Sequence, residues 1–378
     1  MSGFIFAIGS DEKTGDAFSA IKKAVLNGYF STRINVFASN KNPFEGTLAD
    51  YCSMKPGDNV YFFYKRKIYG IGELVAINGE CKMENYPGST DQKRSGLHYE
   101  DIKKELLFDA GKKNSFLYPW ICFFKPAPSF FSLGIDMDDA LTYKPSAFKS
   151  LRTFWKKSLI QIDDEENEAL KEAILISCSG KQELPFSPET HLKFKQQLGS
   201  ACRTIDPTIA AAYSQLQDVV KHEMAIEACV VDDLVRGKHT ELEGAWDFVT
   251  HQLNASPFKP IDYMDRIDVF AYKYLPNTQA ISEFLIIELK AESADDNTID
   301  QVSKYVDWVC ETYAYGNYNR IKALIIAHDF KVSSLQNFKK NAERTFVISS
   351  HPVHNEKWSN LHLISYSFEK KLKLKKIA

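Results

Sequence analysis

The sequence predicts an α/β protein in which a β-rich N-terminal domain and a C-terminal α/β sandwich are joined by a helical connector. Residues 1–150 hold aromatic and β-branched runs separated by turns, and residues 151–220 show acidic and helical patterns. Residues 221–378 read as helix, hairpin, helix, strand, helix and strand. A chain of 378 residues is long enough for two domains, and a third is possible.

Composition restricts the class of protein. Charged residues make up 25% of the chain and hydrophobic residues 44%, which is ordinary for a soluble globular protein. The net charge of −2 gives no global signal of nucleic-acid binding, so any basic surface must be local. Seven cysteines without Cys-x-x-Cys spacing indicate reduced thiols and argue against a zinc site. Without a signal-peptide pattern or an apolar run of about 20 residues, we expect a soluble cytoplasmic protein with no membrane partner.

The N-terminal domain, residues 1–150, contains one expected helix among several strands. In residues 16–26, Ala17, Ile21 and Val25 have helical spacing. The apolar and aromatic runs around this helix are typical of strands. We expect strands at residues 4–8, 59–64, 68–75 and 118–124.

A hairpin is the clearest pattern in this domain. Lys55-Pro-Gly-Asp58 suits a type II turn before the first strand, and Lys65-Arg66-Lys67 separates the two strands. Gly70 and Gly72 stand two residues apart in the second strand, which fits a bend or bulge in a small barrel.

These residues resemble the PUA-like barrels of the EVE and YTH kind. The resemblance rests on Gly57-Asp58 before an aromatic strand, on Tyr69-Gly-Ile-Gly-Glu73, and on a strand bearing Trp120. Such domains often hold a flipped or modified base in an aromatic cage. The cage residues that the resemblance implies are Trp120 together with Tyr61, Phe63 or Tyr69.

Two alternatives accompany that interpretation. For any single aromatic residue, packing in the barrel interior is the better explanation. Arg66 and Lys67 could contact phosphate groups of a nucleic acid, or could only solubilise the tip of the hairpin.

Residues 151–220 read as a connector or an oligomerisation element. The acidic run 163–168 favours the start of a helix over 169–176. Two prolines indicate a loop at 182–188. Asp206 and Pro207 suit an N-cap and a first helical position, for a helix that could run towards Leu234.

The strongest pattern lies in the C-terminal domain. Residues 266–274 and 284–290 read as strands, and a turn at 275–280 joins them into a hairpin. If the hairpin is centred on Thr278, Asp268 stands opposite Glu288, with side chains within roughly 5 Å. Strand alternation puts Lys290 on the face of Glu288.

Two carboxylates and one ammonium would therefore meet at the end of an apolar strand. Burying unpaired charge is costly, and like charges so close repel unless a cation lies between them. Oxygen ligands suit Mg²⁺ or Mn²⁺. An ordinary surface ion-pair cluster is the commoner explanation for any one acidic residue, but it accounts poorly for the apolar setting.

The rest of the domain completes the α/β order. Apolar residues at helical spacing follow Ala294, and Gln301 and Tyr305 lie four apart at the edge of that stripe. The basic tail at 369–378 could contact phosphates, although such tails are as often solvated and disordered. We expect strands at residues 321–327 and 361–368 and a helix at residues 332–342.

The pattern Asp268, Glu288-x-Lys290 and Gln301-x-x-x-Tyr305 is similar to the signature of PD-(D/E)xK nucleases. The surrounding residues look closest to NucS-type endonucleases and Shedu anti-phage nucleases, over about residues 220–370. The resemblance implies a restriction-endonuclease-like sandwich and the five signature residues as the catalytic set.

The same resemblance implies a metal site and one further glutamate. Asp268, Glu288 and the Leu289 carbonyl would hold Mg²⁺ or Mn²⁺. The family usually adds a glutamate from the helix before the hairpin. Glu223 fits that position best, with Glu227 and Glu243 as competitors, although Glu223 precedes Asp268 by a long interval.

We therefore expect a metal-dependent DNA endonuclease whose N-terminal domain selects the substrate. Restriction or anti-phage defence is the setting that the resemblance and the domain pairing suggest. DNA is the expected partner, and a homo-oligomer, either a dimer or a tetramer, is the expected assembly. The alternatives are a catalytically inactive nucleic-acid-binding or scaffold protein and an RNA-directed nuclease.

Overall fold

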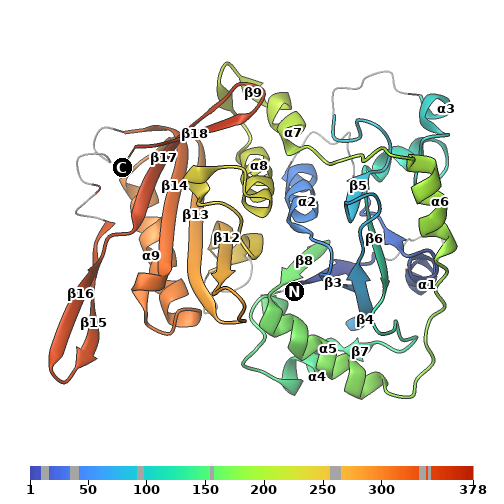
Figure 1. Cartoon of the computed structure of the whole chain (residues 1–378), viewed down its shortest axis with the longest axis horizontal. Coiled ribbons are helices and arrows are strands. Elements are labelled where there is room, and N and C mark those ends of the chain that lie inside the picture. The colour runs from blue at the N-terminus through green and yellow to red at the C-terminus, as the bar shows by residue number, and fades with distance from the viewer. Residues whose placement is uncertain are drawn as a thin grey trace. The chain divides into compact units, whose positions relative to one another are not determined.

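The chain forms two compact units, which are described separately (Figure 1). The first is Met1–Asp206 and the second is Pro207–Ala378. The computed structural model describes residues 1–9, 17–34, 42–91, 98–153, 157–255, 265–331, 338 and 342–377.

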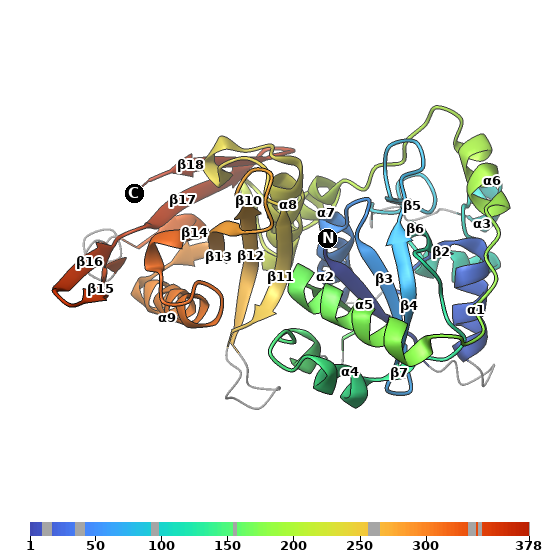
Figure 2. The same cartoon turned by 60° about the horizontal axis from the view of Figure 1, so that its bottom comes forward.

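Within its described residues, the first unit is built on a curled, half-barrel sheet of eight strands (Figure 2). Its order is β2-β6-β4-β3-β1-β8, with β5 paired to β6 and β7 paired to β4. β1 and β3 run parallel, and the other pairs are antiparallel. The strands are β1 Gly3–Ala7, β2 Tyr29–Phe30, β3 Asn59–Tyr64, β4 Lys67–Leu74, β5 Lys82–Glu84, β6 Trp120–Pro126, β7 Ile135–Asp136 and β8 Leu159–Ile162.

Helices pack against this sheet. Leu170 and Ile174 of α5 are buried in one cluster with Ile5 of β1 and Ile71 of β4. The helix begins as expected at an acidic cap, because Asp163 Oδ1 accepts a hydrogen bond from the Glu166 N–H at 2.9 Å. The helical elements are α1 Ala17–Asn27, α2 Asn42–Ser53, α3 Tyr99–Ile102, η1 Lys112–Leu117, α4 Met137–Tyr143, η2 Leu151–Thr153, α5 Asp164–Cys178 and α6 Glu189–Leu198.

The bend expected at Gly70 and Gly72 is confirmed. The register of β3 and β4 shifts between Val60 and Phe62. A Cβ atom added at Gly70 would lie 2.6 Å from the ring of Tyr61, and one at Gly72 would lie 2.7 Å from the ring of Phe130. Glycine at these positions therefore allows two aromatic rings to enter the interior.

The structure divides residues 151–220 between the two units. β8 pairs with β1, so this part of the expected connector belongs to the first sheet. α7 Pro207–Tyr213 opens the second unit where Asp206 and Pro207 predicted a helix start.

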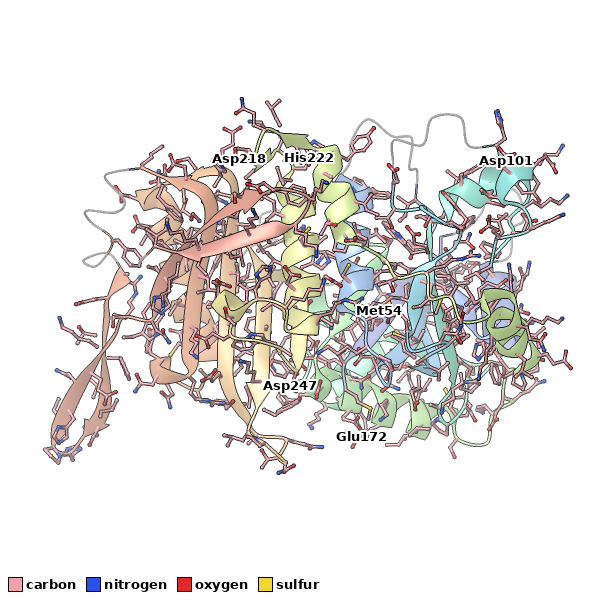
Figure 3. The ribbon with its side chains drawn as sticks, turned by 45° about the horizontal axis from the view of Figure 1, so that its top comes forward. Met54, Asp101, Glu172, Asp218, His222 and Asp247 are labelled. Atoms are coloured by element: carbon pink, nitrogen blue, oxygen red, sulfur yellow. The ribbon has the colours of Figure 1, made fainter. Side chains whose placement is uncertain are left out.

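The expectation that this helix runs on towards Leu234 is wrong. The chain turns back as a small hairpin of β9 Gln215–Leu216 and β10 Val219–Val220 before α8 Glu223–Arg236 begins. Gln217 adopts the left-handed φ of 59°, which cannot continue a right-handed helix. Asp218 lies in this turn, and His222 precedes α8 (Figure 3).

The second unit is built on a six-stranded sheet within its described residues, in the order β11-β12-β13-β14-β17-β18. β13, β14 and β17 run parallel, and the other neighbours are antiparallel. α9 and α8 lie on opposite sides of this sheet (Figures 1 and 2). The remaining elements are β11 Phe248–Asn254, β12 Arg266–Tyr274, β13 Ile281–Ala294, β14 Ile321–Phe330, β15 Arg344–Ser350, β16 Val353–Trp358, β17 Leu361–Phe368, β18 Leu372–Lys376, α9 Asp296–Thr312, η3 Thr240–Leu242 and η5 Tyr318–Arg320.

The register expected for the β12–β13 hairpin is confirmed. Val269 pairs with Ile287, and the same register continues to Lys273 and Glu283. Phe284 and Ile286 face the core that α9 covers. This register continued by one residue places Asp268 opposite Glu288.

Other expectations about the second unit have mixed outcomes. Part of the basic tail is ordered as β18, because Leu372 and Leu374 alternate with exposed lysines and bury their side chains beside β17. The helix expected at 332–342 falls mostly outside the described residues. None of the described helices is long and apolar enough to cross a membrane.

Candidate active site

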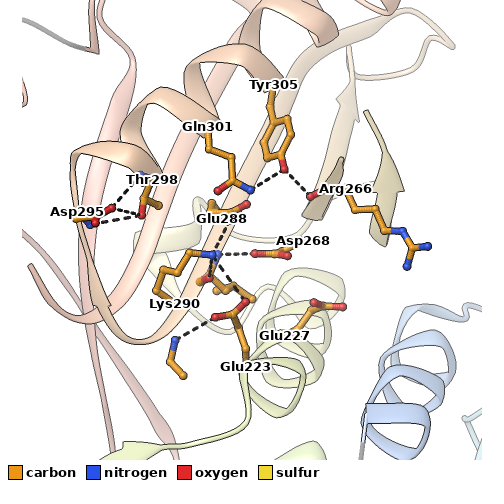
Figure 4. A network of polar contacts seen from close by, with 12 residues as sticks. Glu223, Glu227, Arg266, Asp268, Glu288, Lys290, Asp295, Thr298, Gln301 and Tyr305 are labelled. Carbon is orange, nitrogen blue, oxygen red and sulfur yellow. Dashed lines mark hydrogen bonds and ion pairs between the residues drawn. The ribbon is translucent and has the colours of Figure 1, made fainter. Parts of the chain in front are cut away.

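Asp268 and Glu288 meet at the end of the β12–β13 hairpin. Their exposed fractions are only 8% and 1%. Asp268 Oδ2 accepts a hydrogen bond from the Leu289 N–H at 2.7 Å, which ties its carboxylate to the strand that carries Glu288. Figure 4 shows the side chains of Asp268, Glu288 and Lys290 converging on one point.

Both carboxyl groups have raised pKa values. Burial raises the pKa of Asp268 well above its usual range, and the neighbouring charges of Glu288 and Glu227 raise it further. Burial also raises the pKa of Glu288, although the ammonium of Lys290 opposes this shift. The protein alone therefore does not fully stabilise the two negative charges.

Lys290 is the cation of this cluster. Its Nζ donates to Glu288 Oε1 at 2.7 Å and to the Leu289 carbonyl at 3.0 Å, and lies 3.8 Å from Glu223 Oε1. Burial alone would lower the pKa of Lys290, but the charge of Glu288 and its hydrogen bond outweigh that effect and raise it. Lys290 is therefore held as an ammonium group.

One buried carboxylate oxygen of this cluster could serve as a ligand for a metal ion. Glu288 Oε2 is buried and has no hydrogen-bond partner among the described residues. The Asp268 carboxylate and the Leu289 carbonyl are further oxygen groups of the same cluster, and oxygen is the ligand type that suits Mg²⁺ or Mn²⁺. No group of three or more His, Cys, Asp and Glu side chains is arranged to hold a metal ion in the part of the chain described. Main-chain oxygen and water would therefore have to complete the shell.

Gln301 and Tyr305 connect α9 to the strand that bears Asp268. Gln301 Nε2 donates to the Tyr305 hydroxyl at 2.8 Å, and that hydroxyl donates to the Arg266 carbonyl at 2.8 Å. Arg266 opens β12 two residues before Asp268. The two hydrogen bonds therefore hold the start of β12, the strand that carries Asp268, against α9.

The structure separates the three candidate helix glutamates. Glu223 lies near Lys290 and accepts a hydrogen bond from the Ala291 N–H at 3.3 Å. Glu227, one turn later on α8, is buried at 1% exposure and is also near Asp268. Glu243 instead pairs with Lys322, which also contacts Glu283 at the turn end of the hairpin. Glu243 therefore lies outside the candidate site.

Sequence reasoning missed two residues of the site, His251 and Gln252. Both lie on β11 and both contact the carboxylate of Glu227, and Gln252 also contacts Asp268. No motif spacing marks them, because β11 joins the hairpin through pairing that the local pattern does not specify. Regular alternation along the strand would place His251 and Gln252 on opposite faces, so the local pattern gives no signal for their shared contact.

The aromatic residues proposed as a base cage are packed against protein groups. The Tyr61 hydroxyl donates to Asn167 Oδ1 at 2.8 Å, and Trp120 Nε1 donates to Thr90 Oγ1 at 3.0 Å. Both side chains are buried, at 0% and 1% exposure. Tyr61 belongs to the core under α5, whereas the Trp120 ring packs on Tyr51. The described structure does not bring these two rings together.

The remaining N-terminal candidates also have protein neighbours. The Tyr69 ring packs on Phe18, with centroids 5.2 Å apart, and Phe63 packs at the edge of the core under α5. The remaining pair lies at the tip of the β3–β4 hairpin. Arg66 contacts Asp138 at 2.6 Å, and Lys67 stands opposite Asp136 in the register of β4 with β7.

Comparisons with known proteins assign no family. No family model matches the chain, and no curated protein matches it. A repair endonuclease from Pyrococcus abyssi is 20% identical over 30% of this chain and 42% of that chain, with a TM-score of 0.22. A protein from Agrobacterium tumefaciens is 15% identical over 46% of this chain and 93% of that chain, with a TM-score of 0.26. These values are too low to support an argument about fold or activity.

Proposed function

We propose that the protein is a metal-dependent DNA endonuclease that hydrolyses phosphodiester bonds with Asp268, Glu288 and Lys290. The observation that carries this proposal is the buried pair of carboxylates with raised pKa values, one of whose oxygens has no partner among the described residues. An ammonium group stands beside them. The similarity of the sequence signature to PD-(D/E)xK nucleases supports the same chemistry.

Each residue has a distinct role in this proposal. Asp268, Glu288 and the Leu289 carbonyl would hold Mg²⁺ or Mn²⁺. When bound, that cation would lower the pKa of a water molecule and neutralise charge on the scissile phosphate. Lys290 would orient the water or stabilise the negative charge that develops on the phosphate.

The residues around this centre would hold it in place. Gln301 and Tyr305 would keep the start of β12, and therefore Asp268, in a fixed position through the Arg266 carbonyl. Glu223, next to Lys290 and partly exposed, would be the helix glutamate.

We propose further that the N-terminal unit selects the substrate. The support is its curled sheet and the sequence resemblance to PUA-like domains. Because Tyr61 and Trp120 are packed in the interior, Arg66 and Lys67 at the hairpin tip are the better candidates for contact with a phosphate backbone. Restriction or anti-phage defence is the setting that the sequence resemblance suggests.

A cleavage panel tests the proposed activity. Wild-type protein and Lys290→Ala would be incubated with single-stranded, mismatched, modified and free-ended DNA, and with RNA, in Mg²⁺ or in EDTA. Lys322→Ala is the matched control, because Lys322 makes comparable contacts to two glutamates at the other end of the hairpin. We expect DNA cleavage in Mg²⁺ only, lost in Lys290→Ala and kept in Lys322→Ala.

Each other outcome has a definite meaning. Equal cleavage by Lys290→Ala would remove Lys290 from the mechanism. Cleavage of RNA alone would favour an RNA-directed nuclease. Absence of metal-dependent cleavage on every substrate would contradict the proposal and favour a binding or scaffold protein.

A further inference from the structure

Gln252 has an unusual backbone for a residue inside a strand. Its φ is 51°, in the left-handed region that residues other than glycine rarely adopt. On either side of it, His251 pairs with Val269 and Leu253 pairs with Ile267. Gln252 therefore stands opposite Asp268. Strained backbone of this kind is kept only where surrounding contacts enforce it, and it concentrates at functional sites.

The left-handed residue brings two successive side chains to one carboxylate. In a regular strand, neighbouring side chains point to opposite faces of the sheet. Here His251 Nδ1 contacts Glu227 Oε1 at 2.5 Å, and Gln252 Nε2 donates to Glu227 Oε2 at 2.8 Å. Glu227 is thus held through both of its oxygens by adjacent residues of β11.

The same amide nitrogen also reaches Asp268. Gln252 Nε2 lies 3.2 Å from Asp268 Oδ1, and the other oxygen of Asp268 accepts the Leu289 N–H at 2.7 Å. A primary amide carries two N–H donors, so one nitrogen can serve both carboxylates. Asp268 is consequently fixed by one donor from β11 and one from β13, the strands on either side of it.

We infer that Gln252 is a positioning residue that orients the Asp268 carboxylate for a divalent cation, with Glu227 as the anchor of Gln252 and not as a ligand of the cation. This inference rests on the proposed function. A neutral amide suits the place between two buried carboxylates, since it donates to both of them without adding charge. His251 contacts Glu227 Oε1, the oxygen that Gln252 does not use, and so keeps the Glu227 carboxylate in its orientation.

Two substitutions at one position separate orientation from stability. Gln252→Ala and Gln252→Gly both remove the amide, but only glycine relieves the left-handed backbone. Metal-free preparations of the full chain would be titrated with Mn²⁺ by calorimetry, and the urea midpoint of each would be measured. We expect both variants to bind Mn²⁺ about 10- to 100-fold more weakly than wild type, as when outer-shell partners of metal ligands are removed. We expect Gln252→Gly to have the higher urea midpoint of the two.

Glu227→Gln tests the role of the anchor. If Glu227 only holds Gln252, Glu227→Gln weakens Mn²⁺ binding less than Gln252→Gly does. A larger loss in Glu227→Gln than in Gln252→Gly would make Glu227 a ligand and overturn that part of the inference.

The outcomes distinguish this inference from the proposed function. Wild-type Mn²⁺ affinity in both Gln252 variants would overturn the positioning role and leave the proposed metal site intact. Loss of binding that follows the urea midpoint, with Gln252→Gly restored towards wild type, would mean that Gln252 acts only on stability. Absence of Mn²⁺ binding by wild-type protein would overturn both proposals together.

Discussion

The β12–β13 hairpin carries charged side chains opposite each other at both of its ends. At the turn end, Lys273 stands opposite Glu283 in the strand register and donates its Nζ to the Glu243 carbonyl, and Lys322 contacts the carboxylates of both Glu283 and Glu243. The side chains of Glu283 and Glu243 are 38% and 45% exposed. At the far end, the side chain of Glu288 is only 2% exposed, and Asp268 is buried as well.

The two ends differ in charge balance as well as in burial. At the turn end, Lys322 forms ion pairs with two partly exposed glutamates, and such pairs contribute little to stability. At the far end, Lys290 is the lysine that contacts Glu288, whereas Glu223, Glu227 and Asp268 add further negative charge. Burial, a majority of acidic groups and a Glu288 oxygen with no partner within the described part of the chain therefore distinguish a candidate catalytic site from an ordinary ion-pair cluster on the same hairpin.

Removing the buried glutamate is the strongest test of this contrast. Glu288→Gln is expected to reduce Mg²⁺-dependent DNA cleavage by about 1,000-fold, because a cation contributes several kcal/mol to stabilising the transition state. Glu283→Gln, at the turn end, is expected to keep the wild-type rate within about twofold. Single-turnover rates measure both, and equal rates for the two variants would remove the distinction between the ends.

The two lysines provide the next comparison. Lys290→Met is expected to reduce cleavage by about 100-fold, because it removes a cationic donor from the reacting phosphate. It is also expected to bind Mn²⁺ more tightly than wild type, because the ammonium no longer occupies Glu288 Oε1 and the Leu289 carbonyl. Lys322→Met should change neither quantity. Weaker Mn²⁺ binding by Lys290→Met would contradict this account.

A smaller effect is expected from the contact that holds the start of β12. Tyr305→Phe removes the hydroxyl that donates to the Arg266 carbonyl, so Asp268 should be held less firmly and cleavage should fall about 10-fold. Tyr318→Phe is the matched control, since its hydroxyl donates to Asp307 Oδ1 at 3.0 Å. Initial rates at saturating Mg²⁺ distinguish the two, and an unchanged rate in Tyr305→Phe would limit this tyrosine to packing.

The pKa shifts predict an effect on stability. Because the pKa of Asp268 is higher in the folded chain than in the unfolded chain, the folded state binds more protons above about pH 4. The free energy of unfolding of the metal-free protein should therefore fall as pH rises from about 4 towards the raised pKa. Asp268→Asn is expected to flatten this dependence and to raise the free energy of unfolding at pH 7 by about 1 kcal/mol.

Urea unfolding at several pH values checks this expectation. Glu283→Gln is the control and should change the free energy of unfolding by less than about 0.5 kcal/mol. A lower free energy of unfolding for Asp268→Asn than for wild type at neutral pH would contradict this expectation. It would mean that the folded protein stabilises the ionised Asp268 carboxylate.

Local patterns were sufficient to predict the hairpin and its register. The β-branched runs around a turn fixed the positions of Asp268 and Glu288, and helical spacing put Gln301 beside Tyr305. These features depend on residues close in sequence, whose geometry follows from the periods of strands and helices.

Features that depend on distant or unusual contacts could not be predicted in this way. Gln252 itself adopts the left-handed conformation in which it contacts Asp268, and no intrinsic propensity of glutamine predicts that conformation. The aromatic pattern of the first unit did not reveal that Tyr61 would bond to Asn167 of α5. The helix α7 ends at Tyr213 and the chain turns at Gln217, and the helical spacing of apolar residues does not predict that turn.

The central claim is that a divalent cation binds between Asp268 and Glu288, and anomalous diffraction from crystals grown with Mn²⁺ tests it most directly. The account predicts an anomalous peak about 2.2 Å from an oxygen of each carboxylate. A peak only at the turn end, beside Glu243 and Glu283, or no peak near Asp268 and Glu288 at saturating Mn²⁺, would contradict it.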